Sequence, residues 1–402
     1  ISINDFAGYS FNESSTMAKY ATLSAPVASD LTWETTYQYN LGLDAAFLDN
    51  RLEFTGEAYI RDTRNMLTEG VKLPSIYGAD APKSNTADLR TKGYELSLSW
   101  RDQFMLLGSP FGYRFRTTLS DYRSFITKYD NPEKSFAKAY YEGMRIGEIW
   151  GFVVDGLFAT DEEAQKYQAE ICDCTGYISG RMTGGFRAGD LRYIDLDGDN
   201  KLGIGQNTVD KPGDRKVLGN SLPSLQYGIT AGFDWKGADF SIFFQGVGNH
   251  YWYPAGFNYA FWGPYSYSYA SFIPRDFLTK MCWSEENPDA YFPRPRSYSS
   301  TGGELSKVNS RYIQNIRYLR LKNITLGYTL PSEWTRKVGL EKVRVYYSGE
   351  NLHYWSPLTK VTKYLDPESA FSRSSSGSAT DHLAYPWQKS NMFGIDITDR
   401  KS

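Results

Sequence analysis

Apolar and polar residues alternate strictly through one run of the chain, Arg51-Leu52-Glu53-Phe54-Thr55-Gly56-Glu57-Ala58-Tyr59-Ile60-Arg61-Asp62. The even positions up to Ile60 are apolar or small, and the odd positions are mostly charged or polar. Successive side chains of a β-strand point to opposite faces, whereas a helix needs apolar residues spaced three and four apart. The run therefore predicts a strand with one apolar face and one polar face.

The same alternation recurs along the chain and predicts an antiparallel all-β protein. The residue pattern slips by one position around Lys322–Asn323, which indicates a β-bulge inside one long strand. We expect roughly ten strands of the length that a tilted strand needs to cross a bilayer. Besides the run above, the clearest alternating segments are 41–47, 94–100, 225–235, 240–246, 319–328, 343–347 and 393–397.

The predicted connections between strands alternate between short and long. Outer-membrane barrels have tight periplasmic turns at one end and large extracellular loops at the other, whereas a Greek-key sandwich has no reason to sort its loops. We therefore expect a segment of an antiparallel transmembrane β-barrel with long extracellular loops. The short links are 49–50, 102–111, 236–238 and 331–341, and the long links are 63–92, 126–220, 250–315 and 353–389.

Composition fits a barrel, excludes a helical membrane protein and gives no indication of a nucleic-acid partner. Tyr, Phe and Trp make up 16% of the 402 residues, which is typical of aromatic girdles at the two membrane interfaces. No window approaches ~18 uninterrupted apolar residues, so a helical membrane protein is excluded. The formal net charge is −2, which gives no electrostatic reason to expect nucleic acid as a partner.

Cysteine and histidine usage indicates no redox, zinc or enzyme site. Cys172, Cys174 and Cys282 are too few for a disulfide framework, although one of the first two could pair with Cys282 in an oxidising compartment. The three histidines lie far apart in expected loops, and no G-x-S-x-G, H-E-x-x-H or phosphate-binding glycine loop is present. We therefore expect a protein that is not an enzyme.

One acidic segment, from Asp195 to Gln206, resembles the spacing of a calcium loop. Carboxylates at alternate positions can surround one hard cation, which makes Ca²⁺ the only cofactor that we consider. Gln206 occupies position twelve of this loop, where a calcium loop usually has a bidentate acid. The alternative is an acidic turn that binds no metal. The candidate ligands are Asp195, Asp197, Asp199 and Gln206.

Aromatic residues are concentrated between positions 251 and 269. Flat rings stack on sugars and peptide planes, so this segment is a candidate for a loop that faces a substrate. The alternative is a girdle and a loop that packs on itself. The candidate substrate-facing residues are Trp252, Tyr253, Trp262, Tyr265, Tyr267 and Tyr269.

Taken together, the sequence blocks resemble the C-terminal barrel region of SusC/RagA-family TonB-dependent outer-membrane transporters. They follow the order of the family over nearly the whole chain. The matching blocks include Leu31-Thr32-Trp33-Glu34, Ile146-Gly147-Glu148-Ile149-Trp150-Gly151, Gly189-Asp190-Leu191-Arg192-Tyr193, Trp283-Ser284-Glu285-Glu286-Asn287-Pro288 and Tyr318-Leu319-Arg320-Leu321-Lys322-Asn323.

The resemblance implies active import of a glycan or an oligopeptide through the outer membrane of a gram-negative bacterium. It also implies energy supplied by TonB and a SusD-like surface lipoprotein as a lid. Such transporters close at about 22 strands, so we expect residues 1–402 to be the C-terminal portion of the barrel. The plug domain and the N-terminal strands, through which TonB would act, are expected outside this chain.

Two other classes of function are compatible with parts of the pattern. A passive outer-membrane porin or a surface adhesin would share the strands and the loops. A soluble glycan-binding β-protein would share the aromatic content, but not the alternation of loop lengths.

Overall fold

The computed structural model describes most of the chain. Side chains are described between residues 26 and 398, and for residues 2–5 and 19–22 only the backbone is described. The described residues are 2–5, 19–22, 26–29, 31–70, 74, 76, 81–173, 176–178, 184–266, 273, 275–370 and 387–399.

Nine long strands form one antiparallel sheet in the order β17-β16-β15-β12-β11-β6-β5-β4-β3. The alternating run that begins at Arg51 lies in β4, as predicted. The register between β12 and β15 shifts between Phe243 and Phe244, opposite the predicted bulge. The bounds are β3 Thr35–Phe47, β4 Leu52–Glu69, β5 Lys83–Leu106, β6 Ser109–Lys128, β11 Ser224–Trp235, β12 Ala238–Asn249, β15 Tyr318–Thr329, β16 Leu340–Trp355 and β17 Ser390–Asp399.

The short and long connections alternate as the sequence predicts. The turn between β11 and β12 is Lys236-Gly237, and both residues have positive φ (47° and 85°). Two-residue hairpin turns need this conformation to match the twist of the strands. The link between β15 and β16 holds α4 (Ser332–Thr335) and a 3-10 turn (Arg336–Val338).

The chain divides into two compact units. The first consists of residues 1–40, 59–92 and 123–145 and includes the small hairpin of β1 (Ser2–Asp5) and β2 (Lys19–Thr22). The second consists of residues 41–58, 93–122 and 146–402. All the sites discussed below lie in the second unit.

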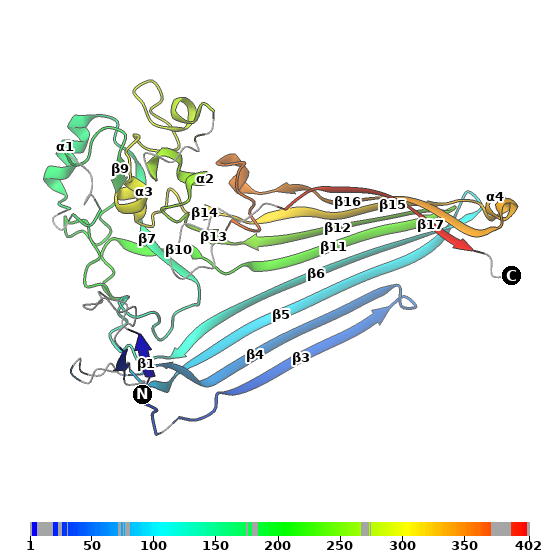
Figure 1. Ribbon diagram of the computed structural model, residues 1–402, viewed down its shortest axis with the longest axis horizontal. Coiled ribbons are helices and arrows are strands. Elements are labelled where there is room, and N and C mark those ends of the chain that lie inside the picture. The colour runs from blue at the N-terminus through cyan, green and yellow to red at the C-terminus, as the bar shows by residue number, and fades with distance from the viewer. Residues whose placement is uncertain are drawn as a thin grey trace. The chain divides into compact units, whose positions relative to one another are not determined.

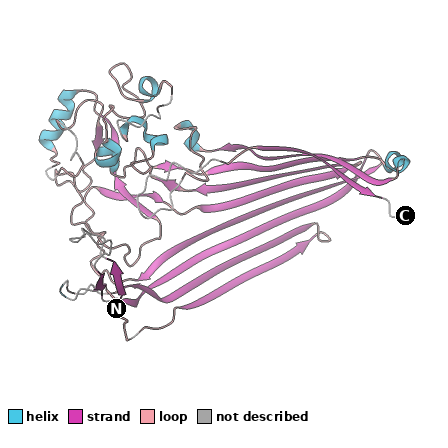
Figure 2. Cartoon of the chain, viewed as in Figure 1, coloured by secondary structure: helices cyan, strands magenta, loops and turns pink. Residues whose placement is uncertain are grey.

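The long connections of the second unit fold into a body with a core of its own, which we call the loop body (the described parts of 146–220, 250–317 and 356–370). Figure 1 shows its helices and short strands at one end of β11, β12, β15 and β16, with α4 at the other end. Figure 2 shows that these connections carry most of the helix in the chain. Its elements are β7 Glu148–Phe152, β8 Val154–Leu157, α1 Asp161–Glu170, β9 Leu191–Tyr193, β10 Arg215–Asn220, β13 Tyr251–Trp252, α2 Tyr259–Trp262, α3 Ser299–Gly302, β14 Gln314–Asn315, 3-10 turns Gly263–Tyr265, Glu304–Ser306 and Pro357–Lys360, and a π-turn Phe277–Met281.

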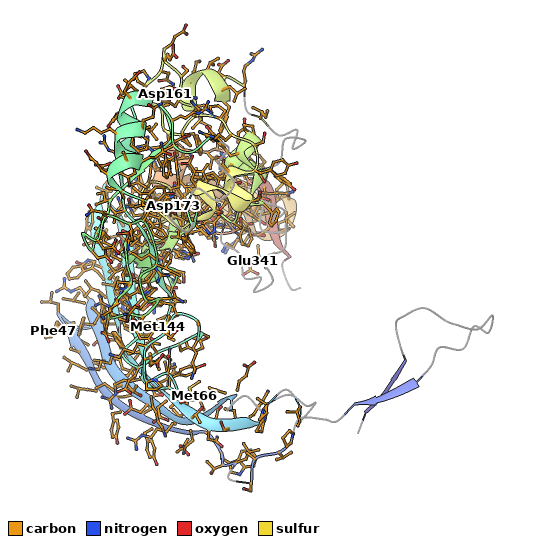
Figure 3. The ribbon with its side chains drawn as sticks, turned by 90° about the vertical axis from the view of Figure 1, so that its left-hand side faces the viewer. Phe47, Met66, Met144, Asp161, Asp173 and Glu341 are labelled. Carbon is orange, nitrogen blue, oxygen red and sulfur yellow. The ribbon has the colours of Figure 1, made fainter. Side chains whose placement is uncertain are left out.

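The core of the loop body is largely aromatic. Phe158, Trp262 and Phe292, with at most 1% of their surface exposed, belong to one cluster that also includes Leu358 from the β16–β17 connection. Figure 3 shows side chains crowded through this region, around Asp161 at the start of α1 and Asp173. The three long connections therefore stabilise one another.

Among the described residues, no helix is long and apolar enough to span a membrane.

Candidate functional site

The sheet of the second unit has one polar face and one apolar face. The register of β6, β11, β12, β15, β16 and β17 places paired residues on the same face. The polar face carries Arg114, Arg116, Thr118, Gln226, Thr230, Asp234, Asp239, Ser241, Gln245, Arg320, Thr325, Arg344, Ser348 and Glu350. The apolar face carries Phe111, Phe115, Ile229, Phe233, Phe240, Ile242, Phe244, Leu321, Ile324, Leu326, Val345, Phe393, Ile395 and Ile397.

Aromatic rings gather at both ends of the apolar face. Near the short turns, the ring of Phe233 stacks between those of Phe111 and Phe240, with centroids 5.6 and 5.3 Å away. Near the loop body, the ring of Trp355 lies 6.5 Å from that of Phe244. Leu326 and Ile395, which lie between these ends, are more than half exposed. This arrangement is the one expected of a membrane-facing surface with two girdles.

A cavity of about 780 Å³ lies on the polar face, near the loop body. Its lining is rich in amide and carboxyl groups, which bind solutes through hydrogen bonds, and it includes one exposed indole ring. We take this cavity as the candidate functional site. The lining includes Gln226, Gln245, Glu350, Glu368 and Trp387.

A buried ion pair holds the β16–β17 connection against the polar face beside this cavity. The guanidinium of Arg320 in β15 donates to the carboxylate of Asp366, and their side chains are only 1% and 3% exposed. The ammonium of Lys322 donates to both carboxylate oxygens of Glu368 at 2.9 Å. It also lies 4.7 Å from the ring centroid of Trp387. The cavity wall is therefore fixed by charges that neutralise one another.

A second set of ion pairs crosses the polar face at the short-turn end. Arg114 pairs with Asp234 at 2.8 Å, and Arg344 pairs with Asp239 at 2.7 Å and with Asp396 at 3.0 Å. All of these residues except Asp396 line a hollow of about 440 Å³. The polar face thus carries charged side chains at both ends, as a water-filled lumen requires.

The structure buries the aromatic residues that the sequence suggested as facing a substrate. Trp262 and Tyr265 are fully buried, and Trp252 is 7% exposed. The hydroxyl of Tyr253 donates to the backbone oxygens of Leu305 and Lys307 at 2.8 and 2.9 Å.

Trp252, Trp262 and Tyr265 lie in the core of the loop body, so their ring faces are not available to a ligand, which contradicts the substrate-facing prediction for these three. The burial of these three residues agrees with the alternative of a loop that packs on itself. Tyr253 is partly buried against this core, and for it the prediction is not tested. Tyr267 and Tyr269 lie outside the described residues.

Three carboxylates form a cluster at the acidic segment, and one of them, Asp214, is not among the predicted ligands. One oxygen from each of Asp195, Asp197 and Asp214 lies within 4.8 Å of the others. Asp199 does not belong to this cluster, and its carboxylate accepts from the backbone of Lys201 at 2.8 Å. The prediction for the amide of Gln206 is not tested. Burial, together with the charges of Asp197 and Asp195, raises the pKa of Asp214 to about 6.

Asp214 reaches the cluster because two backbone segments meet. Gly205 and Gly213 have φ of +56° and +63°, and a Cβ on Gly205 would lie 2.6 Å from the nitrogen of Gly213. The carboxylate of Asp214 accepts from the backbone of Leu196 at 2.7 Å. Calcium binding stays a prediction, with Asp214 as a further candidate ligand.

The family follows from a comparison with known proteins. Residues 3–352 match the model of the TonB dependent receptor-like β-barrel family. The chain belongs to this family.

Curated relatives of this receptor-family chain come from two bacteria. It is 27% identical over 386 residues to the TonB-dependent receptor P3 of Formosa agariphila, covering 92% of this chain and 34% of the relative. It is 23% identical over 403 residues to the TonB-dependent receptor SusC of Bacteroides thetaiotaomicron, covering 98% and 34%. The chain spans about a third of the length of these relatives.

Solved structures show the same fold. The RagAB peptide transporter superposes with a TM-score of 0.64 at 18% identity, over 98% of this chain and 38% of that chain. Its open-open state gives a TM-score of 0.66 over 99% and 37%. The sheet of this chain therefore has the fold of a segment of such a barrel, in agreement with the β-barrel family.

Two details of this receptor-family chain differ from the sequence expectations. Cys282 is a buried free thiol whereas Cys172 is in a disulfide, so the bridge considered between them does not form. His353 lies in β16, not in a loop. The sequence did not suggest the cavity residue Trp387, which follows a long connection. The alternation of the strand 225–235 does place the cavity residue Gln226 on the polar face.

Proposed function

We propose that this chain forms part of the wall and of the extracellular loops of an outer-membrane importer of a gram-negative bacterium, energised by TonB. Family membership supports an importer, and the two faces of the sheet support a wall between lipid and a water-filled lumen. TonB would act through parts of the complete transporter outside this chain.

The proposed cargo is a glycan or an oligopeptide, taken up together with a SusD-like surface lipoprotein. The peptide transporter RagAB supports the peptide class, and the resemblance to the SusC/RagA family supports both classes and the lipoprotein lid. The lid would lie over the loop body, which is at the extracellular end in this orientation.

The observation that carries the proposal is the amide-rich cavity on the polar face. Gln226, Gln245 and Glu350 present hydrogen-bonding groups, and Trp387 offers an exposed ring for stacking. Sugars and peptides both need such a mixture, whereas a closed structural core does not.

The test is uptake of defined oligosaccharides and oligopeptides by cells that carry the complete transporter, with and without TonB. We expect one of the two classes to be depleted from the medium only when TonB is present. Gln245→Trp, which fills the cavity, should reduce the uptake rate at least several-fold. Phe244→Trp changes the neighbouring residue on the apolar face of the same strand and should leave uptake unchanged.

Two outcomes would contradict the proposal. Uptake that continues without TonB indicates a passive porin. Binding of cells to a glycan surface without any uptake indicates an adhesin.

A further inference from the structure

A groove of the second unit lies at the loop-body end of the apolar face and shares Val247 and Tyr318 with the candidate cavity of the polar face. It has a volume of about 940 Å³. Its lining includes Tyr227, Leu319 and Trp355, which belong to the apolar face by strand register. Polar-face positions at the strand ends also contribute: Val247, Tyr318 and Tyr354. The groove is therefore continuous with the surface that we assign to lipid.

The upper rim of this groove carries only positive charge. Arg317, Lys360, Lys363 and Lys389 line it, and all four residues are exposed. No aspartate or glutamate contributes to the lining. Within the part of the chain that the structure describes, none of the four makes an ion pair with a carboxylate.

The nearby cations of the polar face behave differently. Arg320 and Lys322 lie in β15, which also contributes Leu319 to the groove. Both are paired with acids of the β16–β17 connection. That connection therefore sends its acids, Asp366 and Glu368, to the polar face and exposes its lysines, Lys360 and Lys363, to the groove. The β16–β17 connection thus has acidic side chains towards the polar face and basic side chains towards the groove.

The floor of the groove suits an amphipathic occupant. Trp355 is 50% exposed, and its ring lies 4.5 Å from that of His353. Tyrosine and tryptophan at this depth are typical of the membrane interface, where headgroups meet acyl chains. A soluble anion would gain nothing from the apolar floor, and a neutral lipid would gain nothing from the four cations.

We propose that this groove binds the phosphorylated headgroup of a lipid of the surrounding outer leaflet. Arg317, Lys360, Lys363 and Lys389 would hold the phosphate, and the acyl chains would lie along Leu319 and Phe244 towards the middle of the bilayer. The proposal rests on the orientation given under the proposed function, with the loop body outside the cell.

The experiment compares lipid binding by the complete purified transporter and by two charge-matched variants. The groove variant carries Arg317→Gln, Lys360→Gln, Lys363→Gln and Lys389→Gln. The control variant also removes one arginine and three lysines from exposed positions outside the groove: Arg336→Gln, Lys337→Gln, Lys211→Gln and Lys216→Gln. Native mass spectrometry would count retained lipids after addition of lipid A or of enzymatically dephosphorylated lipid A.

We expect the wild type and the control to retain lipid A and the groove variant to bind it at least tenfold more weakly, since each basic residue near an anionic surface contributes about fivefold. Dephosphorylated lipid A should bind equally weakly to all three. Equal retention of lipid A by the groove variant and the control would overturn the proposal, as would displacement of lipid A by an equal concentration of inorganic phosphate.

The result is independent of transport. A groove variant that loses the lipid but still imports solute separates this site from the import function. Failure of import in the wild type, with lipid binding intact, would count against the proposed function only.

Discussion

Arg320 shows how one residue links the wall to a loop that is distant in sequence. Its guanidinium is buried beside the carboxylate of Asp366, and its charge also lies 4.9 Å from the ring centroid of Tyr354. Removing one member of a buried pair leaves an uncompensated charge and costs about 3–5 kcal/mol. The pair therefore stabilises the position of the whole β16–β17 connection.

The first prediction concerns this pair. Arg320→Gln should release the segment around Lys360 and Lys363 and increase its cleavage by trypsin in outer-membrane vesicles. An opening cost lowered by about 3 kcal/mol raises the open population roughly 100-fold. The double variant Arg320→Gln/Asp366→Asn should recover part of the protection, because no buried charge remains. Unchanged cleavage in Arg320→Gln would show that the pair does not hold the loop.

Glu304 gives the loop body a dependence on pH. Its side chain is fully buried, one carboxylate oxygen accepts from the backbone of Leu191 at 3.2 Å, and burial together with the charge of Asp190 raises its pKa to about 8. The folded state therefore keeps a proton that the unfolded chain releases near pH 4.5. The resulting stability is complete below pH 4.5 and is lost as the pH rises to about 8.

The second prediction follows from that sign. Protection of the loop body against hydrogen exchange should decrease between pH 5 and pH 8, after correction for the intrinsic exchange rate. Glu304→Gln keeps the shape of the side chain without a titratable group and should weaken this dependence, most of all above pH 6, because Asp214 titrates at about pH 6. Glu286→Gln, an exposed position, is the control and should keep it. Identical profiles for Glu304→Gln and the wild type would refute the assignment.

The third prediction concerns calcium at Asp195, Asp197 and Asp214. Millimolar Ca²⁺ should raise the melting temperature of the complete transporter in detergent, and a chelator should reverse the change. Asp214→Asn should remove most of the response, whereas Asp210→Asn, an exposed neighbour outside the cluster, should keep it. A response that is equal in all three proteins would place the calcium elsewhere.

At the scale of the elements, glycines on the strands make room for the side chains of neighbouring strands. A Cβ on Gly327 of β15 would lie 2.4 Å from a carboxylate oxygen of Asp239 and 2.6 Å from a nitrogen of Arg344. The ion pair between β12 and β16 thus passes over Gly327.

The fourth prediction tests this role. Gly327→Ala should displace the two charged side-chain ends and destabilise the folded barrel by about 0.2–1 kcal/mol, the contribution of a partly exposed ion pair. The measurement is the temperature at which the complete transporter loses its folded mobility on a gel in dodecyl sulfate. Gly112→Ala in β6 is the control, because nothing lies within 4 Å of its Cβ position. Equal midpoints for the two variants would contradict the steric explanation.

The strands could be predicted from sequence, whereas the assembly of the loops could not. A period of two is a local signal, so the run at Arg51 and the bulge at Lys322 were readable from neighbouring residues. Burial of Trp262 and Tyr265 depends on contacts with residues distant in sequence, such as Phe292, and the spacing of neighbouring residues does not predict such contacts. The replacement of Asp199 by Asp214 in the acidic cluster likewise depends on the meeting of Gly205 and Gly213.

At the scale of the whole molecule, every proposal depends on which face of the sheet meets lipid. The candidate cavity lies on the polar face and the proposed lipid groove lies at the end of the apolar face, with Val247 and Tyr318 common to both. Neighbouring residues of β12 belong to different faces: Phe244 to the apolar face and Gln245 to the polar face. If the apolar face did not meet lipid and the polar face did not meet water, the sheet would not be a barrel wall.

The most direct test is the environment of spin labels at Phe244→Cys and Gln245→Cys in the complete transporter, reconstituted in lipid. The label at position 244 should collide mainly with oxygen, which concentrates in the bilayer. The label at position 245 should collide mainly with a water-soluble nickel chelate, because it faces the lumen. Equal access of the nickel chelate to both labels would contradict the assignment of the sheet as a barrel wall.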